Sequence, residues 1–143
     1  MIKLLSNSRI YDRITDAAFF MHKIIKNWIL VFVWAGFIFL LSHQPFLESG
    51  LPGQWDFALR KIAHITEYAI LTLLLIRALK EHRLKVSQII ILSIVIAVFY
   101  AISDEYHQTF ILGRHGVPQD VLIDSLGIFL MAWFNRKKMI ELK

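Results

Sequence analysis

Four apolar stretches, each near the length of a membrane-spanning helix, most constrain how this chain can fold. They cover residues 24–42, 57–79, 86–102 and 119–134. A helix needs about 20 residues to cross the roughly 30 Å hydrocarbon core of a bilayer. The last stretch is short, so we expect its start to lie below the membrane surface. The pattern predicts an all-α fold, a four-helix transmembrane bundle formed by residues 24–135.

Composition supports this class of fold. The chain is 57% hydrophobic and 19% charged, whereas soluble domains average about 45–50% and about 25%. A length of 143 residues leaves room for a single compact bundle. The absence of cysteine excludes disulfides, thiolate metal sites and a cysteine nucleophile.

Residues 1–23 form a different segment. Apolar residues recur at helical spacing (Ile10, Ile14, Ala17, Ala18 and Met21), and charged residues lie on the other side. This pattern predicts an amphipathic helix lying in the membrane interface. A secretory signal is the alternative, but its basic region would be too long, and no small-x-small cleavage site follows.

Basic residues are distributed unevenly between the ends of the predicted spans. Of the 16 Lys and Arg, 13 lie before the first span, around the 80–85 connection or in the basic tail 136–143. Only Arg60, Lys61 and Arg114 lie at the other ends. By the positive-inside rule, both termini are cytoplasmic, and the 43–56 and 109–118 loops face outward. The same rule accounts for the pI of about 9.6, so we expect no nucleic-acid partner.

A polar run, Ser103 to Gln108, follows directly on the third apolar stretch. Burying such groups unpaired costs several kcal/mol each, so they need partners, water or a function. At 100° per residue, one face of each helix gathers polar groups at the same outer level. The second stretch contributes Lys61, His64 and Tyr68, and the third contributes Tyr100, Asp104, His107 and Gln108, with Glu105 at the edge of that face. The fourth contributes Asp120, Asp124 and Gly127, and the end of the first contributes Ser42 to Gln44. We predict a polar pocket that opens outward, with Gly127 allowing a close helix approach.

The residue types suggest two kinds of chemistry. His64 with Asp104 or Glu105 forms a candidate catalytic acid–base pair, and we expect His64 within hydrogen-bond or single-water reach of Asp104, Glu105 or Asp120. Lys61 and Arg114 are suited to a phosphate, pyrophosphate or carboxylate. The chain has no nucleophile elbow and no His-Glu-x-x-His spacing, so no metal or cofactor is predicted. The alternative is structural: His64 bonded to a carboxylate across the bundle, and the acids paired with Lys61 and Arg114 for packing.

Together these motifs resemble the VanZ-like family. The resemblance covers about residues 25–134 and depends on Ser42-x-Gln44, Lys61-x-x-His64-x-x-x-Tyr68, Asp104-Glu105-x-His107-Gln108-x-Phe110, Gly113-Arg114 and Asp120-x-x-x-Asp124-x-x-Gly127. It implies a multi-pass protein of the bacterial cytoplasmic membrane, associated in some members with reduced susceptibility to teicoplanin-type glycopeptides. The family pattern often has Asn at the position of Asp124.

Three functional hypotheses remain open. The first is a cell-envelope protein whose pocket binds an anionic outer-leaflet ligand, either a lipid-linked cell-wall precursor or a glycopeptide. Its ligand-binding residues would be Lys61, His64, Tyr68, Asp104, Glu105, His107, Gln108, Arg114, Asp120 and Asp124. The second is an intramembrane enzyme acting on a lipid or peptide through His64, Asp104 and Glu105. The third is a small scaffold or structural subunit whose polar core only holds the four short helices together. Membrane lipid is an expected partner under all three hypotheses.

Overall fold

The structure, a computed structural model, describes residues 2–45, 52–114 and 116–141. In this part of the chain it consists of four helices, with turns and loops between them: α1 (Ile2–Ser42), α2 (Gly53–Lys80), α3 (Val86–Gln108) and α4 (Pro118–Glu141). The predicted all-α fold is confirmed. Each helix contains one of the four predicted apolar stretches, and α4 also includes most of the basic tail.

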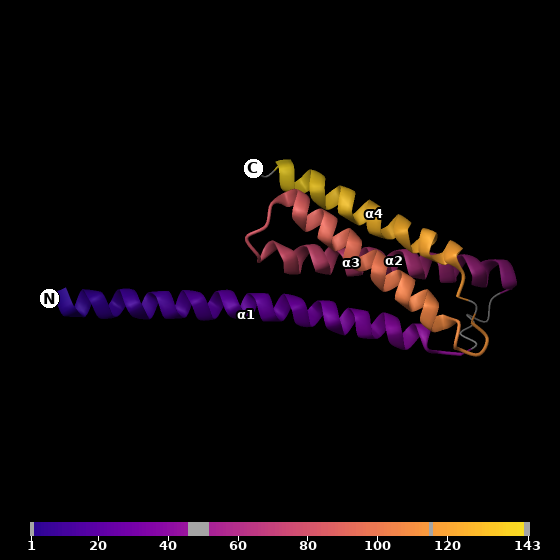
Figure 1. The fold of residues 1–143 in the computed structure, drawn as a ribbon, viewed down its shortest axis with the longest axis horizontal. Coiled ribbons are helices and arrows are strands. Elements are labelled where there is room, and N and C mark those ends of the chain that lie inside the picture. The colour runs from indigo at the N-terminus through magenta and orange to yellow at the C-terminus, as the bar shows by residue number, and fades with distance from the viewer. Residues whose placement is uncertain (1, 46–51, 115, 142–143) are drawn as a thin grey trace.

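The helices form an elongated bundle with α2 at its centre. Helix α2 contacts α1, α3 and α4, and α4 also packs against α3 (Figure 1). Both chain ends and the α2–α3 connection lie at one end of the bundle, whereas the other two connections lie at the opposite end (Figure 1). The three basic segments of the sequence therefore gather at one end of the molecule.

Helix α1 is longer than predicted. It runs without interruption from Ile2 to Ser42 and projects beyond the other helices (Figure 1). The predicted boundary at residue 23 is therefore not a break in the helix, which follows from the absence of Pro and Gly around it. The helical state of the N-terminal segment is as predicted, and its position in the membrane interface stays a prediction.

The outer surface of the bundle is apolar. Large side chains such as Phe32, Phe99 and Leu122 are about 70% exposed. In the described part of the chain, three helical segments are long and apolar enough to cross a membrane: Arg13–Ser42, Gly53–Lys80 and Val86–Gln108. An exposed apolar surface of this extent is typical of a protein that faces lipid. Helix α4 is more polar than these three segments.

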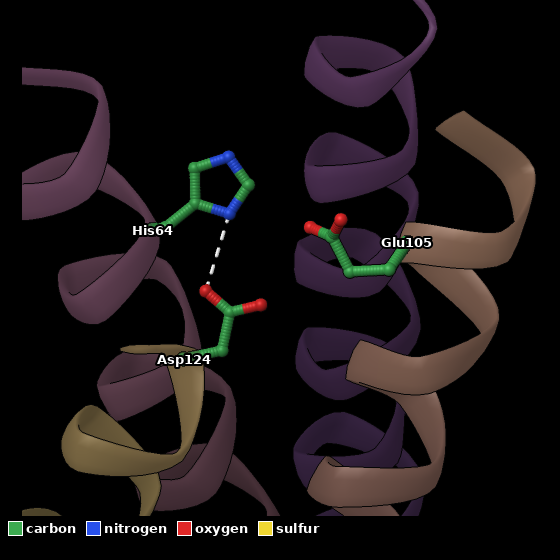
Figure 2. A group of neighbouring side chains, drawn as sticks. All are labelled: His64, Glu105 and Asp124. Carbon is green, nitrogen blue, oxygen red and sulfur yellow. Dashed lines mark hydrogen bonds and ion pairs between the residues drawn. The ribbon is translucent and has the colours of Figure 1, made fainter. Parts of the chain in front are cut away.

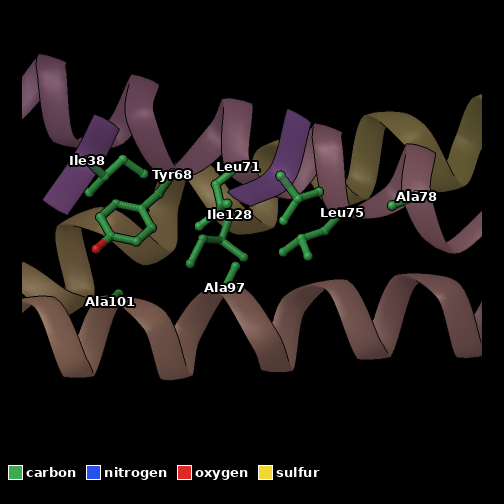
Figure 3. Close-up of a cluster of buried hydrophobic side chains, with 9 residues drawn as sticks. Ile38, Tyr68, Leu71, Leu75, Ala78, Ala97, Ala101 and Ile128 are labelled. Carbon is green, nitrogen blue, oxygen red and sulfur yellow. The ribbon is translucent and has the colours of Figure 1, made fainter. Parts of the chain in front are cut away.

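The bundle core is built on one face of α2. Tyr68, Leu71 and Leu75 point between the other helices and meet Ile38 of α1 and Ile128 of α4 (Figure 3). Two small residues of α3, Ala97 and Ala101, line the same core (Figure 3). Small side chains let helix backbones approach closely, which is how membrane helices gain most of their packing energy.

Gly127 marks the closest approach between α2 and α4. A Cβ placed at this glycine would lie 2.0 Å from the backbone oxygen of Ile65 and 3.2 Å from the backbone nitrogen of Ala69. Only a residue without a side chain fits there, as the sequence predicted. This contact brings α2 and α4 together one turn from Asp124 and next to His64.

Candidate functional site

A cluster of three side chains from three helices lies inside the end of the bundle opposite the chain termini. His64 of α2 faces Asp124 of α4, and Glu105 of α3 points toward both (Figure 2). The Nδ1–H of His64 donates to Asp124 Oδ1 at 3.2 Å. One ring nitrogen and one oxygen from each carboxylate all lie within 4.8 Å of one another. Asp124 has no exposed surface, and Glu105 is 4% exposed.

Asp104 adjoins this cluster on the side of α1. Its Oδ2 accepts hydrogen bonds from Ser42 Oγ at 2.8 Å and from Gln108 Nε2 at 3.0 Å. The same Gln108 amide lies 3.5 Å from Glu105 Oε1. Gln108 therefore ties the two neighbouring acids of α3 together, and Ser42 connects them to the end of α1.

The loop before α4 holds the other oxygen of Glu105. The backbone N–H of Val117 donates to Glu105 Oε2 at 3.1 Å. A Cβ at neighbouring Gly116 would lie 2.0 Å from the backbone oxygen of Glu105, so this loop can approach α3 because residue 116 is glycine. Gly113 supplies the turn, with φ of 78°, a conformation that side chains disfavour. The sequence analysis missed the role of Gly116, although a Gly-x-Pro spacing before a helix is a recognisable turn signal.

Three buried polar atoms at the site have no hydrogen-bond partner among the described residues. They are the Tyr68 hydroxyl, Asp104 Oδ1 and Asp124 Oδ2. Tyr68 is completely buried. Leaving such a group unsatisfied costs about 1–3 kcal/mol, and more when it is charged. Native proteins rarely tolerate this without water, an ion or a function nearby.

A basic cavity of about 410 Å³ opens beside the cluster, between α2 and the loop before α4. Its lining includes the cations Arg60, Lys61 and Arg114, together with His64 and one carboxylate, Asp120. Lys61 forms an ion pair with Asp120. The cavity thus combines several positive charges with the imidazole of His64, which also bonds the buried Asp124.

Arg114 is held by the end of α1. Its Nη2 donates to the carbonyl of Leu41 at 2.8 Å, and its Nε donates to the carbonyl of Gln44 at 3.2 Å. These contacts satisfy carbonyls that a helix end leaves free. Burial, and next the positive charge of nearby Arg60, lower the pKa of Arg114 from its ordinary value. The carboxyl groups of Asp104, Glu67 and Glu105 act on this pKa in the opposite direction, so the guanidinium lies between a second cation and several acids.

Most of the predicted site residues meet, but with different partners from those expected. Glu105 lies within the single-water reach of His64 that was predicted. The direct hydrogen bond of His64, however, goes to Asp124, and the ion pair of Lys61 goes to Asp120 rather than to the acids of α3. Helical phase predicts which face of a helix is polar, but it does not predict which neighbouring helix that face meets.

His107 lies apart from the cluster. Its Nε2 is 3.2 Å from Nδ1 of His43, and its ring packs on Phe39 of α1. It sits three residues after Asp104 and therefore turns toward α1 rather than toward α2 and α4.

Arg60 belongs to the site although it was not predicted as a site residue and was counted only as a charge. It lines the cavity and pairs with Asp56 at 2.8 Å. Its position next to Lys61 was the available signal.

The fold and this site define a small helical membrane protein with an acidic buried cluster and an adjoining basic cavity at one end of its bundle. The family model VanZ/LLP1 matches residues 21–137. The chain therefore belongs to the VanZ/LLP1 family, and the resemblance seen in its motifs is confirmed. No curated protein matches the chain significantly. No solved structure matches it significantly either.

Proposed function

We propose that this protein binds an anionic ligand at the outer face of the bacterial cytoplasmic membrane. The basic cavity is the observation that carries the proposal, because it brings Arg60, Lys61 and Arg114 around one space of about 410 Å³. Guanidinium and ammonium groups form their strongest hydrogen bonds with phosphates and carboxylates. The outer leaflet offers such groups on lipid-linked cell-wall precursors.

The orientation of the cavity follows from charge. The end of the bundle that carries both termini and the α2–α3 connection also carries 13 of the 16 Lys and Arg (Figure 1). The positive-inside rule places that end in the cytoplasm, with all four helices spanning the membrane and the basic cavity outside. Three cations at an outer end run against this bias, and a role in ligand binding accounts for them.

A direct binding experiment tests the proposal. Full-length protein in nanodiscs is titrated with a polyprenyl pyrophosphate, and the corresponding polyprenol serves as the uncharged ligand with the same tail. We expect binding of the pyrophosphate only, weakened about tenfold by Arg60→Gln, the equivalent of about 1.4 kcal/mol. Arg60 is the cation of choice because its side chain is 42% exposed, which limits the cost of its removal to stability.

The same helix provides a matched control. Arg77 lies at the opposite end of α2 in a second basic cavity, together with Lys23, Lys26 and Lys80. Arg77→Gln removes an identical charge from the cytoplasmic side and should leave binding unchanged. Equal affinity for pyrophosphate and polyprenol, or equal weakening by the two substitutions, would contradict the proposal.

The His64–Asp124 pair supports a second candidate function, an intramembrane acid–base enzyme. A carboxylate bonded to Nδ1 orients the imidazole and leaves Nε2 available for proton transfer. His64 also lines the basic cavity, so a bound phosphate ester or peptide would lie next to that ring. This enzyme hypothesis would be favoured over simple binding if the wild-type protein released product from a lipid substrate and His64→Asn did not.

A cellular consequence follows from either function. A protein that occupies or alters lipid-linked precursors changes what glycopeptide antibiotics encounter at the membrane surface. We therefore expect deletion of the gene to shift teicoplanin susceptibility and Arg60→Gln to behave like the deletion. Unchanged susceptibility on deletion would separate this protein from the resistance phenotype of its family.

A further inference from the structure

The buried acids of the outer cluster lack the positive charge that would balance them. Asp104 and Glu105 are each 4% exposed, and Asp124 is fully buried. Among the described residues, the Lys and Arg ion pairs near the site use Asp56 and Asp120 instead. Only the imidazole of His64 contacts one of the three acids as a possible cation. Burying three carboxylates without compensation costs several kcal/mol for each charge.

The geometry of the cluster suits a metal ion. His64, Glu105 and Asp124 each direct one ligand atom toward a common point, and these atoms lie within 4.8 Å of one another (Figure 2). Ligand atoms bound tetrahedrally to one Zn²⁺ at about 2.0–2.2 Å are about 3.3–3.6 Å apart. Small side-chain adjustments on three adjacent helices would therefore close the site, and the His64–Asp124 hydrogen bond would be replaced by two metal–ligand bonds.

Unpartnered polar atoms provide independent support. The second oxygen of Asp124 and one oxygen of Asp104 have no partner, and neither does the Tyr68 hydroxyl. Tyr68 is completely buried, and its ring reaches from α2 toward Ala101, one turn before Asp104 on α3 (Figure 3). A hydroxyl in this position can donate to a carboxylate oxygen or to a water bound by the metal.

We propose that His64, Glu105 and Asp124 bind a divalent transition-metal ion such as Zn²⁺ or Mn²⁺, with Asp104 and Tyr68 as supporting groups. One imidazole and two carboxylates favour these ions over Mg²⁺ and Ca²⁺, which prefer ligand sets made only of oxygen. Three protein ligands leave coordination positions for water or for a ligand from the adjoining basic cavity. The two sites share His64, but metal binding does not require that the cavity hold an anion.

Metal content of the full-length protein tests the proposal first. Protein without a histidine tag is purified in detergent and analysed by inductively coupled plasma mass spectrometry. We expect close to one Zn or Mn per chain. Removal of the ion with a chelator should lower the melting temperature by several degrees, and ZnCl₂ or MnCl₂ should restore it, because a ligand that binds only the folded state stabilises it.

Two pairs of substitutions identify the ligands. Asp124→Asn and Glu105→Gln keep the shape of each side chain and should weaken metal binding at least about tenfold. Asp120→Asn and His107→Gln serve as controls, because they change an acid and a histidine at the same end of the bundle outside the cluster. The control variants should keep the metal.

Three results would overturn the proposal. The first is wild-type protein that contains no bound transition metal and does not change its melting temperature on addition of ZnCl₂ or MnCl₂. The second is binding of Ca²⁺ or Mg²⁺ alone, which would exclude His64 as a ligand. The third is equal loss of metal in the cluster variants and the control variants. Measurements on the wild-type protein decide the question even if a variant does not fold.

Discussion

Replacement of Gly127 by alanine tests the contact that places the two halves of the site. The added Cβ would meet the backbone oxygen of Ile65 at 2.0 Å, whereas ordinary contacts begin at 3.4 Å. Because the obstacle is backbone rather than a flexible side chain, α2 and α4 must separate by more than 1 Å. Overpacking of this kind costs about 1–3 kcal/mol, against which alanine gains about 1 kcal/mol in helix propensity.

We therefore expect Gly127→Ala to be less stable than the wild-type protein by up to about 2 kcal/mol, measured as the free energy of unfolding in mixed micelles with increasing denaturant. The damage should extend to the site. Gly127 lies one turn after Asp124, and Ile65 follows His64 directly. Separation of α2 and α4 at this contact therefore lengthens the 3.2 Å hydrogen bond between His64 and Asp124. Binding at the basic cavity should weaken together with stability.

Gly36→Ala is the matched control. It makes the same substitution within helix α1, where an added Cβ would have nothing within 4 Å. This variant gains helix propensity without a clash and should be as stable as the wild-type protein or slightly more stable. If Gly127→Ala and Gly36→Ala had the same stability, the close approach of α2 and α4 inferred from the structure would be wrong.

Three further outcomes are expected. The chain has no cysteine, so a single cysteine introduced at Gln54 should react with an impermeant maleimide on intact cells, whereas one introduced at Arg83 should not. The reverse pattern would show that the protein has the opposite orientation in the membrane. Ser42→Ala removes a 2.8 Å hydrogen bond to buried Asp104 and should cost about 1–3 kcal/mol of unfolding free energy; no loss would show that water replaces the hydroxyl. His64→Asn should keep its expression level and, once a chelator has removed the metal from both proteins, the melting temperature of the wild-type protein, but it should lose any teicoplanin phenotype; a lower melting temperature in that comparison would favour the structural hypothesis.

The helices, and the end of the bundle at which the site lies, were predictable because both depend on local features of the sequence. Apolar length alone predicts a membrane helix, and α3 begins at Val86, where the third stretch begins. Gly127 was predictable because its face of α4 also carries Asp120 and Asp124. In each case the information lies within one helix.

The partners within the site were not predictable because they depend on how the helices rotate against each other. Phase placed His64 and Asp104 on inward faces, but the close approach at Gly127 turns His64 toward α4 and Asp124. The metal-ligand cluster escaped detection for the same reason, since its three members come from α2, α3 and α4. Sequence motifs for metals rely on ligands close together in one segment, and the three members of this cluster lie in three separate segments of the sequence.

The arrangement of charges also bears on the hypothesis of a purely structural subunit. If the polar groups served only to hold the helices together, direct pairing of the buried acids with the nearby cations would remove the largest energetic penalty. The structure shows a different distribution. Lys61 pairs with half-buried Asp120, and Arg114 donates to the backbone carbonyls of α1. Among the residues that the structure describes, the donors to Asp104 and Glu105 are all neutral groups.

Acidic and basic groups are thus kept in adjoining but separate places, a buried acidic cluster and an open basic cavity, with His64 in contact with both. Separation of this kind raises the energy of the free protein, because Asp104 and Glu105 are buried with hydrogen bonds from neutral groups only among the described residues. It lowers the energy of a state in which a cation fills the cluster and an anion fills the cavity. The charge distribution therefore favours a binding protein over a purely structural one. A variant in which apolar residues replace the cluster has no buried charges, and its gain in unfolding free energy over the wild-type protein measures the energetic cost of the cluster directly.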